Sequence, residues 1–401
     1  MLQDKLFPVT VVGSWTRPEW LVQALRRRQA GDISAQDFNR IADDAVLAAI
    51  KYQEDAGVDI ISDGEMRRDN FYSFVVDKLS GMRLMKLSEL LDYMKDRAGF
   101  EEILRALDVP AFAIKSPIAV DKVREGEAGI AVEEAKFLKA HTTRQTKVPI
   151  PGPYLLTRSS WFEGLSEKTY PTREDLARDV VRILRRECEA LKRAGVDFIQ
   201  LDEPSISQVV YGDEAEQTFM CAALGSRTDP THELEFAVRL MNETIEGIDG
   251  VHFGVHVCRG NWSRKENVLL QGNYGPLLPW LMRMNVHQLV LEMATPRAGE
   301  IGSEREETIA LGLRDHPRPL SFAALQLSLG RLKRTQAFLP VAFEAARHQP
   351  VIGVDGAIAA LGVLRFVIGS LDPEPPLLQR DFAIDFEPLS GGKGGGKPGR
   401  L

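Results

Sequence analysis

The sequence predicts an α/β protein folded as a TIM (β/α)8 barrel whose eighth strand is atypical or incomplete. Short apolar segments alternate with longer segments of helical periodicity, and about eight such units follow one another. Near-continuous apolar strands separated by helices are typical of parallel sheets, and eight units suffice to close a barrel. An open doubly wound sheet is the alternative. Against it, the first expected strand lacks the Gly-x-Gly-x-x-Gly phrase of dinucleotide-binding sheets.

The expected strands are short and bounded by turn residues. In chain order they cover residues 9–13, 57–63, 113–117 (the weakest pattern), 148–152, 197–202, 251–256, 288–292 and 308–315. Helices are expected over residues 35–56, 172–194 and 231–247. Ser34 is placed to cap the first helix. The phrase TRED, which begins at Thr172, forms a capping box for the second, and Gly195 is placed to end it.

A single barrel domain is expected over residues 1–370, followed by an atypical tail over residues 371–401. The last residues, SGGKGGGKPGRL, are glycine-rich and basic, which is typical of disordered segments. The segment PVIGVDGAIAALG, which contains Asp355, could supply a replacement eighth strand. Without one, the barrel would keep an open edge.

Charge and cysteine content argue against several classes of function. The net charge is −7 and the pI about 5.7, so the chain lacks the basic character typical of nucleic-acid-binding proteins. Three cysteines are too few, and odd in number, for a disulfide framework. We find neither a membrane-length apolar stretch nor a signal-peptide pattern at the N-terminus. A soluble cytoplasmic protein with small-molecule partners is expected.

Two phrases nearly repeat each other: AGVDIISDGE from Ala56 and AGVDFIQLDE from Ala194. The shared AGVD is an ordinary helix stop and strand start without functional content. The carboxylates at the ends differ, and they follow strands in otherwise apolar surroundings. In a barrel such strand ends form the C-terminal rim, where the chemistry of barrel enzymes takes place. The acids in question are Asp63, Glu65, Asp202 and Glu203.

Later strands also end on reactive side chains. His256 and Cys258 lie two residues apart, so on an extended strand they point to the same side. Glu292 ends the next strand. Imidazole, thiolate and carboxylate together suit Zn²⁺, and three protein ligands are typical of a catalytic zinc. A buried histidine beside a buried cysteine, without metal, is the alternative.

The first expected strand ends on Gly13 and Ser14. Backbone N–H groups and a hydroxyl at this place could hold a carboxylate. An ordinary turn is the alternative, and the residues alone favour the turn.

Six phrases in one order resemble the catalytic barrel of cobalamin-independent methionine synthase, in particular its short single-barrel relatives. They are VVGSWTRPEWL, ISDGEMRRDNF, PIPGPYLLTRSSW, IQLDEPSI, HVCRGNWSRKE and LVLEMATPRAGE, and the resemblance covers about residues 9–300. It implies a zinc-dependent transfer of a methyl group to the thiol of homocysteine, with a methylfolate or similar donor. A uroporphyrinogen-decarboxylase-like barrel is a remoter alternative, in which the His-x-Cys pair would have no purpose.

The resemblance also implies roles for individual residues. The family's zinc ligands match His256, Cys258 and Glu292. Its residues for the amino-acid substrate match Gly13, Ser14, Glu65 and Asp202. A looser match, in the phrase LGLRDHPRP, gives His316 the part of a catalytic, proton-handling histidine.

The chain departs from the family pattern in its last quarter. The family's fourth zinc ligand is a cysteine near the eighth strand, and here no cysteine follows Cys258. Beyond Asp315 the familiar phrases end, through genuine divergence or a shifted reading frame. Two alternatives follow for the function. The same barrel could use a corrinoid or another methyl donor, with a corrinoid protein or a second copy of the chain as partner. Or the chain could be a catalytically impaired homologue.

Overall fold

The computed structural model describes residues 8–93, 97, 98, 101, 115–211, 229–259 and 270–292, all of which belong to one compact unit. His316, Asp355, the expected strand over 308–315 and the expected tail lie outside the described residues. The α-helices described are α1 (Glu19–Ala30), α2 (Ala35–Asp55), α3 (Leu87–Leu90), α5 (Val132–Ala140), α6 (Pro153–Ser160), α7 (Arg173–Arg193), α8 (Ser205–Tyr211), α9 (Pro230–Ile245) and α10 (Leu278–Leu281). Short 3-10 helices are η2 (Ser73–Asp77), η3 (Leu91–Tyr93) and η4 (Ser166–Lys168).

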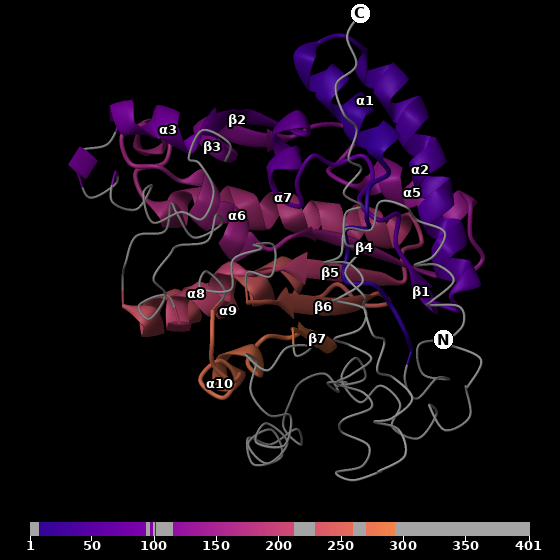
Figure 1. Ribbon diagram of the computed structural model, residues 1–401. Helices are drawn as coiled ribbons and strands as arrows, with labels where there is room; N and C mark the ends of the chain where they lie inside the picture. Colours follow the sequence, from indigo (N-terminus) through magenta and orange to yellow (C-terminus); the bar gives the residue numbers. More distant parts are fainter. Residues whose placement is uncertain are drawn as a thin grey trace, which may run out of the picture. The chain divides into compact units, whose positions relative to one another are not determined.

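The described strands form a parallel sheet in chain order and a separate hairpin. The parallel strands are β1 (Ile60–Ile61), β4 (Gln145–Pro151), β5 (Phe198–Asp202), β6 (His252–Val257) and β7 (Gln288–Leu291), and each pairs with the next (Figure 1). A parallel bridge between Thr10 and Ile60 adds the N-terminal segment beside β1. In a (β/α) barrel, each strand pairs with the next parallel strand along the chain, and helices connect them.

The register of this sheet aligns the strand ends that carry the acids. Pro151 of β4 is level with Asp202 of β5, and Asp202 is level with His256 of β6. Neighbouring strands in a sheet lie about 4.8 Å apart. The side chains of Asp202 and His256 can therefore meet directly at the rim.

Two expected strands differ from the structure. Residues 9–13 form no continuous strand, and among them only Thr10 pairs with another strand, through its parallel bridge to Ile60. The expected strand over 113–117 is wrong as a barrel strand, because β3 (Lys115–Glu125) pairs antiparallel with β2 (Leu79–Lys86). About half of β3 is exposed or half-buried, as suits a hairpin rather than a sheet covered on both faces.

Capping fixes the two long helices where the sequence predicts. The Ser34 hydroxyl accepts a hydrogen bond from the Asp37 amide at the start of α2. Thr172 and Asp175 form the reciprocal capping box of α7. At the far end of α7, Gly195 has a φ of 83°, a left-handed conformation that glycine adopts at little cost.

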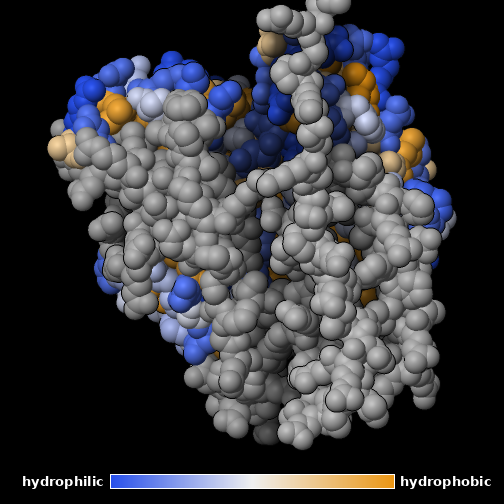
Figure 2. Space-filling view, in the orientation of Figure 1, coloured by the Kyte–Doolittle hydropathy of each residue, from blue (hydrophilic) through white to orange (hydrophobic). Residues whose placement is uncertain are grey.

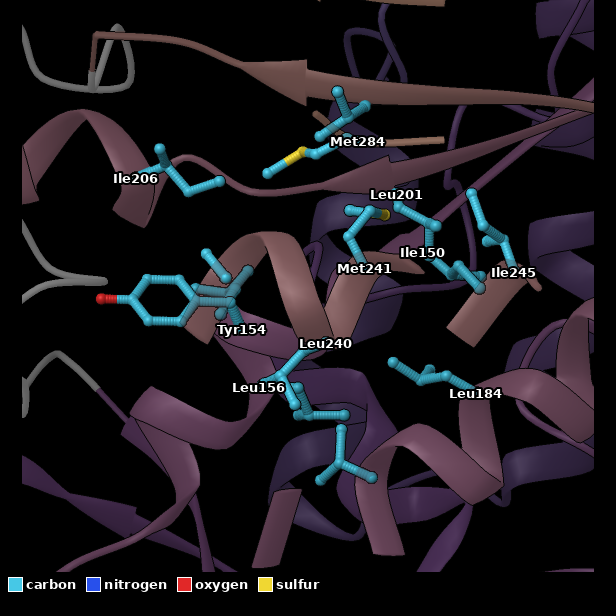
Figure 3. Close-up of a cluster of buried hydrophobic side chains, with 14 of the residues drawn as sticks. Ile150, Tyr154, Leu156, Leu184, Leu201, Ile206, Leu240, Met241, Ile245 and Met284 are labelled. Carbon is cyan, nitrogen blue, oxygen red and sulfur yellow. The ribbon is translucent and has the colours of Figure 1, made fainter. Parts of the chain in front are cut away.

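Helices α6, α7 and α9 bury the outer face of the sheet. Ile150 of β4 and Leu201 of β5 belong to the same buried cluster as Leu184 of α7 and Met241 of α9, and all four are fully buried (Figure 3). Burying side chains of this size contributes roughly 1.5 to 3 kcal/mol each relative to exposure. The cluster therefore holds the strands in register beneath the rim.

The described surface around α1 and α2 is mostly hydrophilic (Figure 2). Trp20, Leu47 and Tyr52 are exposed large hydrophobic residues of these helices, and scattered residues of this kind are normal on a protein surface. Among the described residues, no helix combines the length and the apolar character that crossing a membrane requires.

A buried glutamine ties α2 to the end of β1. Gln53 is fully buried, and its Nε2 donates to the carbonyls of Ala49 (2.9 Å) and Ser62 (2.8 Å). Its Oε1 accepts from the Ser62 amide at 3.0 Å. The backbone just before the Asp63–Glu65 turn therefore depends on one side chain for both of its hydrogen bonds.

Gln53→Leu should lower the free energy of unfolding by about 2 to 4 kcal/mol, because it leaves the buried N–H and C=O of Ser62 without partners. Urea unfolding at neutral pH measures the change. The matched control is Gln36→Leu, at an exposed position of the same helix, which should stay within about 0.5 kcal/mol of the parent. Equal effects of the two substitutions would contradict the assignment.

Candidate active site

The turn after β1 holds Glu65 in a strained backbone conformation. Gly64 has a φ of 68° and Glu65 a φ of 55°, and Glu65 is the one non-glycine residue of the described chain with a positive φ. The Glu65 amide donates to Asp63 Oδ1 at 2.9 Å, which stabilises the turn. Left-handed conformations of this kind cost about 1 to 3 kcal/mol and concentrate at functional sites. The strain aims the Glu65 side chain into the protein.

The carboxylate of Glu65 is nearly enclosed by protein. It is 1% exposed, and the Ser14 hydroxyl donates to its Oε2 at 2.5 Å. A Cβ on Gly13 would lie 2.6 Å from Glu65 Oε1, so any side chain at position 13 would displace the carboxylate. Burial raises the pKa of Glu65, the guanidinium of Arg68 opposes that shift, and the charge of Asp202 adds to it. Gly13, Ser14, Glu65 and Asp202 therefore belong to one electrostatic neighbourhood.

The two acids that end β5 have different surroundings. Asp202 Oδ1 accepts from Gln200 Nε2 at 2.7 Å and lies 3.0 Å from His256 Nδ1. Glu203 turns instead to the start of α6, where its two oxygens accept from the amides of Tyr154 and Leu155, each at 2.8 Å. Burial raises the pKa of Glu203 to about 8 although these amides oppose the shift. Glu203 is thus a structural clamp, and Asp202 belongs to the rim.

His256 and Cys258 lie together at the end of β6. Burial lowers the pKa of His256, but hydrogen bonds with Asp202 and with the Cys258 side chain outweigh it and raise the pKa to about 10. The Ser207 hydroxyl donates to the Cys258 carbonyl at 2.6 Å and holds the loop. Cys188 is the contrasting thiol. It is fully buried within α7, and burial raises its pKa, so it stays protonated.

Glu292 directly follows β7, the strand that pairs with β6. Its amide donates to the carbonyl of Val257, the residue between the histidine and the cysteine, at 3.3 Å. The same amide lies 3.1 Å from the hydroxyl of Tyr274, to which it also donates. Imidazole, thiol and carboxylate on adjacent strand ends fit zinc by donor type. Within the described ranges, however, no three His, Cys, Asp or Glu side chains are gathered closely enough to hold an ion.

The structure thus brings two groups of predicted residues together. Ser14 and Glu65 are hydrogen-bonded beside Gly13, and His256 contacts both Asp202 and Cys258. Glu292 lies beside the second group without completing a three-donor set. His316 lies outside the described residues, so its proton-handling role stays a prediction.

Three buried polar residues around this site escaped the sequence-based prediction. Arg68 is 1% exposed, and its guanidinium pairs with Glu134 at 2.7 Å and lies 3.8 Å from Glu65. Lys147 and Gln200 are fully buried inside the sheet. For Gln200 the available signal was an amide side chain in the middle of an apolar strand pattern, where an unpaired polar group would be costly. Lys147 lies just before the expected strand over 148–152, and Arg68 lies outside any strand, so neither had such a signal.

Comparison with known proteins identifies the family of the chain. Residues 7–226, more than half of the chain, match the family model described as the catalytic domain of cobalamin-independent synthase. The methionine synthase of Sulfurisphaera tokodaii is 32% identical over 291 residues, which cover 72% of this chain and 68% of that protein. The methionine synthase of Sulfolobus acidocaldarius is 29% identical over 262 residues, 65% of this chain and 64% of that protein. The chain therefore spans about two thirds of the length of these relatives.

Solved structures agree on the fold. A B12-independent methionine synthase from Shewanella sp. W3-18-1, in complex with selenomethionine, aligns with a TM-score of 0.50 at 22% identity, over 86% of this chain and 98% of that one. A putative B12-independent methionine synthase from Listeria monocytogenes aligns with a TM-score of 0.52 at 20% identity, over 79% and 91%. These alignments confirm the predicted barrel class. Together with the family match, they lead to one conclusion: the chain belongs to the cobalamin-independent methionine synthase family.

Proposed function

We propose that this chain transfers a methyl group to the thiol sulfur of homocysteine and so forms methionine. One observation carries the proposal: Glu65, which follows β1, and Asp202, which ends β5, are both buried at the rim, and the charge of Asp202 adds to the rise that burial causes in the pKa of Glu65. Two adjoining carboxylates suit the ammonium group of an α-amino acid. The methionine synthases among the relatives support homocysteine as that amino acid.

The substrate ammonium would lie between Glu65 and Asp202. Its arrival would satisfy the Glu65 oxygen that now accepts from Ser14, so the Ser14 hydroxyl could turn to the substrate carboxylate. Backbone N–H groups beside Gly13 would complete that contact. The strained turn at Glu65 supports this role, because the site is organised before the substrate binds.

We further infer that His256, Cys258 and Glu292 hold a zinc ion next to this amino-acid site. A zinc ion held there would lower the pKa of the substrate thiol, which is near 8.5 when free, and so would favour its thiolate form. The carboxylate of Asp202 engages Nδ1 of His256, so Nε2 would be the nitrogen left to hold the metal. The missing fourth ligand would leave more room for water or substrate.

The transfer itself breaks the carbon–nitrogen bond to the methyl group of a methylfolate-type donor and forms the carbon–sulfur bond of methionine. The donor nitrogen keeps the electron pair and takes up a proton, while the homocysteine thiol gives up its own. A corrinoid-bound methyl group is the second donor class.

The full-length chain, supplied with zinc and homocysteine, should form methionine from methyltetrahydrofolate, as detected by mass spectrometry. Parallel reactions with methylcobalamin separate the two donor classes. If zinc-loaded protein forms methionine from neither donor, the chain is a catalytically impaired homologue and the proposal is wrong.

Glu65→Gln and Asp202→Asn should each weaken methionine binding by about 10- to 100-fold, because each removes one charge-assisted hydrogen bond to the ammonium group. Isothermal titration calorimetry measures the dissociation constant. Asp32→Asn, at an exposed position outside the site, is the matched control and should bind like the parent. Unchanged binding by both site variants would rule out an ammonium site between these acids.

Cys258→Ala should lower the zinc content of the purified chain well below one equivalent, because it removes a thiolate ligand. Cys188→Ala removes a fully buried thiol from α7, which takes no part in the strand-end site, and should leave the zinc content unchanged. Elemental analysis after dialysis against zinc provides the readout. Full zinc occupancy in the Cys258 variant would contradict the ligand assignment.

A further inference from the structure

A lysine and a glutamine lie inside the sheet, below the residues at the rim. Lys147 of β4 and Gln200 of β5 are both fully buried. Lys147 Nζ donates to Gln200 Oε1 at 3.0 Å and to the carbonyl of Val11. Burying an ammonium group costs several kcal/mol, and a well-packed apolar pair often folds as well or better. The fold by itself gives no reason for this pair.

Gln200 also holds the carboxylate of Asp202 in place. Gln200 Nε2 donates to Asp202 Oδ1 at 2.7 Å and to the carbonyl of Val12 at 2.9 Å. Since a protonated Lys147 can only donate, it fixes which end of the amide carries the oxygen. A flipped amide would place its oxygen against the carboxylate of Asp202, so Lys147 and Gln200 together hold that carboxylate in one orientation.

The same pair contacts both halves of the site. Val11 and Val12, which accept from the pair, lead directly into Gly13 and Ser14. On the other side, the Asp202 oxygen that Gln200 holds is the one that contacts His256 Nδ1. Burial lowers the pKa of Lys147 to about 7, and the nearby carboxylates of Asp202 and Glu65 oppose that shift.

We propose that Lys147 and Gln200 are positioning residues for methyl transfer. They fix Asp202, and through it the ring of His256, and they tie both to the N-terminal segment that carries Ser14. This proposal rests on the proposed function, because it assigns the ordered residues to the binding of an amino acid and to the histidine beside it. Lys147 and Gln200 touch neither the substrate nor the reacting atoms.

The test uses the metal-free, full-length chain with ¹⁵N-labelled histidines. The double variant Lys147→Met with Gln200→Leu replaces the polar pair by an apolar one. The chain has seven histidines, and a His256→Gln variant identifies the signals of His256 in the NMR spectrum. In the folded double variant, the ring-nitrogen signals of His256 should shift toward those of an imidazole without a fixed Nδ1 partner. Methionine should bind about tenfold more weakly by calorimetry, as expected for one disturbed charge-assisted contact.

Two further variants keep the test decisive. Gln200→Glu retains an acceptor for Lys147 but turns an oxygen toward Asp202, so it should cause the same two changes if the double variant does not fold. Lys139→Met removes a half-buried lysine that pairs with Asp197 at 3.2 Å, at the opposite end of β5, and should change neither. Folded protein with unchanged His256 signals and unchanged methionine binding in Gln200→Glu would overturn the proposal.

The experiments distinguish a failure of the positioning role from a failure of the proposed reaction. If the parent chain forms no methionine but His256 still shifts in the variants, the positioning role stands and the assigned reaction fails. If the parent is active and the folded variants match it in both readouts, the positioning role is wrong while the reaction stands.

Discussion

The position of one carboxylate oxygen, Oδ1 of Asp202, governs the arrangement of the rest of the site. Gln200 reaches this oxygen from within the same strand, and His256 reaches it from the next strand. Both contacts depend on the parallel register that sets Asp202 level with His256. That register depends in turn on the apolar cluster between the sheet and helices α6, α7 and α9. Packing on the outer face of the sheet thus determines the geometry of the polar groups at its rim.

The repeated phrases of the sequence show how one architecture serves two purposes. Each ends a helix, turns through a left-handed glycine and starts a strand. The first then continues into a second left-handed turn, where Glu65 is strained and nearly enclosed. The second ends on neighbouring acids that face different ways, Asp202 toward the rim and Glu203 toward the amides of α6. Acids at equivalent strand ends therefore have different contacts, set by the hydrogen-bonding groups around them.

Local signals in the sequence predict the long helices, the parallel strands and most of the rim residues. The caps of α2 and α7 involve residues three positions apart, and the strand-end acids follow from strand direction alone. The β2–β3 hairpin and the Lys147–Gln200 pair could not be predicted in this way. Lys147 meets Val11 and Gln200 across 136 and 53 positions of the chain, and no local pattern encodes such contacts. The family resemblance supplied the expected roles of individual residues, and the structure supplies the contacts between them.

The most direct test of the whole account is a crystal structure of the chain grown with methionine and zinc, with anomalous data at the zinc edge. The account predicts that the methionine ammonium lies within hydrogen-bond distance of both Glu65 and Asp202. It also predicts a zinc peak on His256 and Cys258, with Asp202 still hydrogen-bonded to Nδ1 of the histidine. Methionine bound elsewhere, or an Asp202 side chain turned away from both Gln200 and His256, would contradict it.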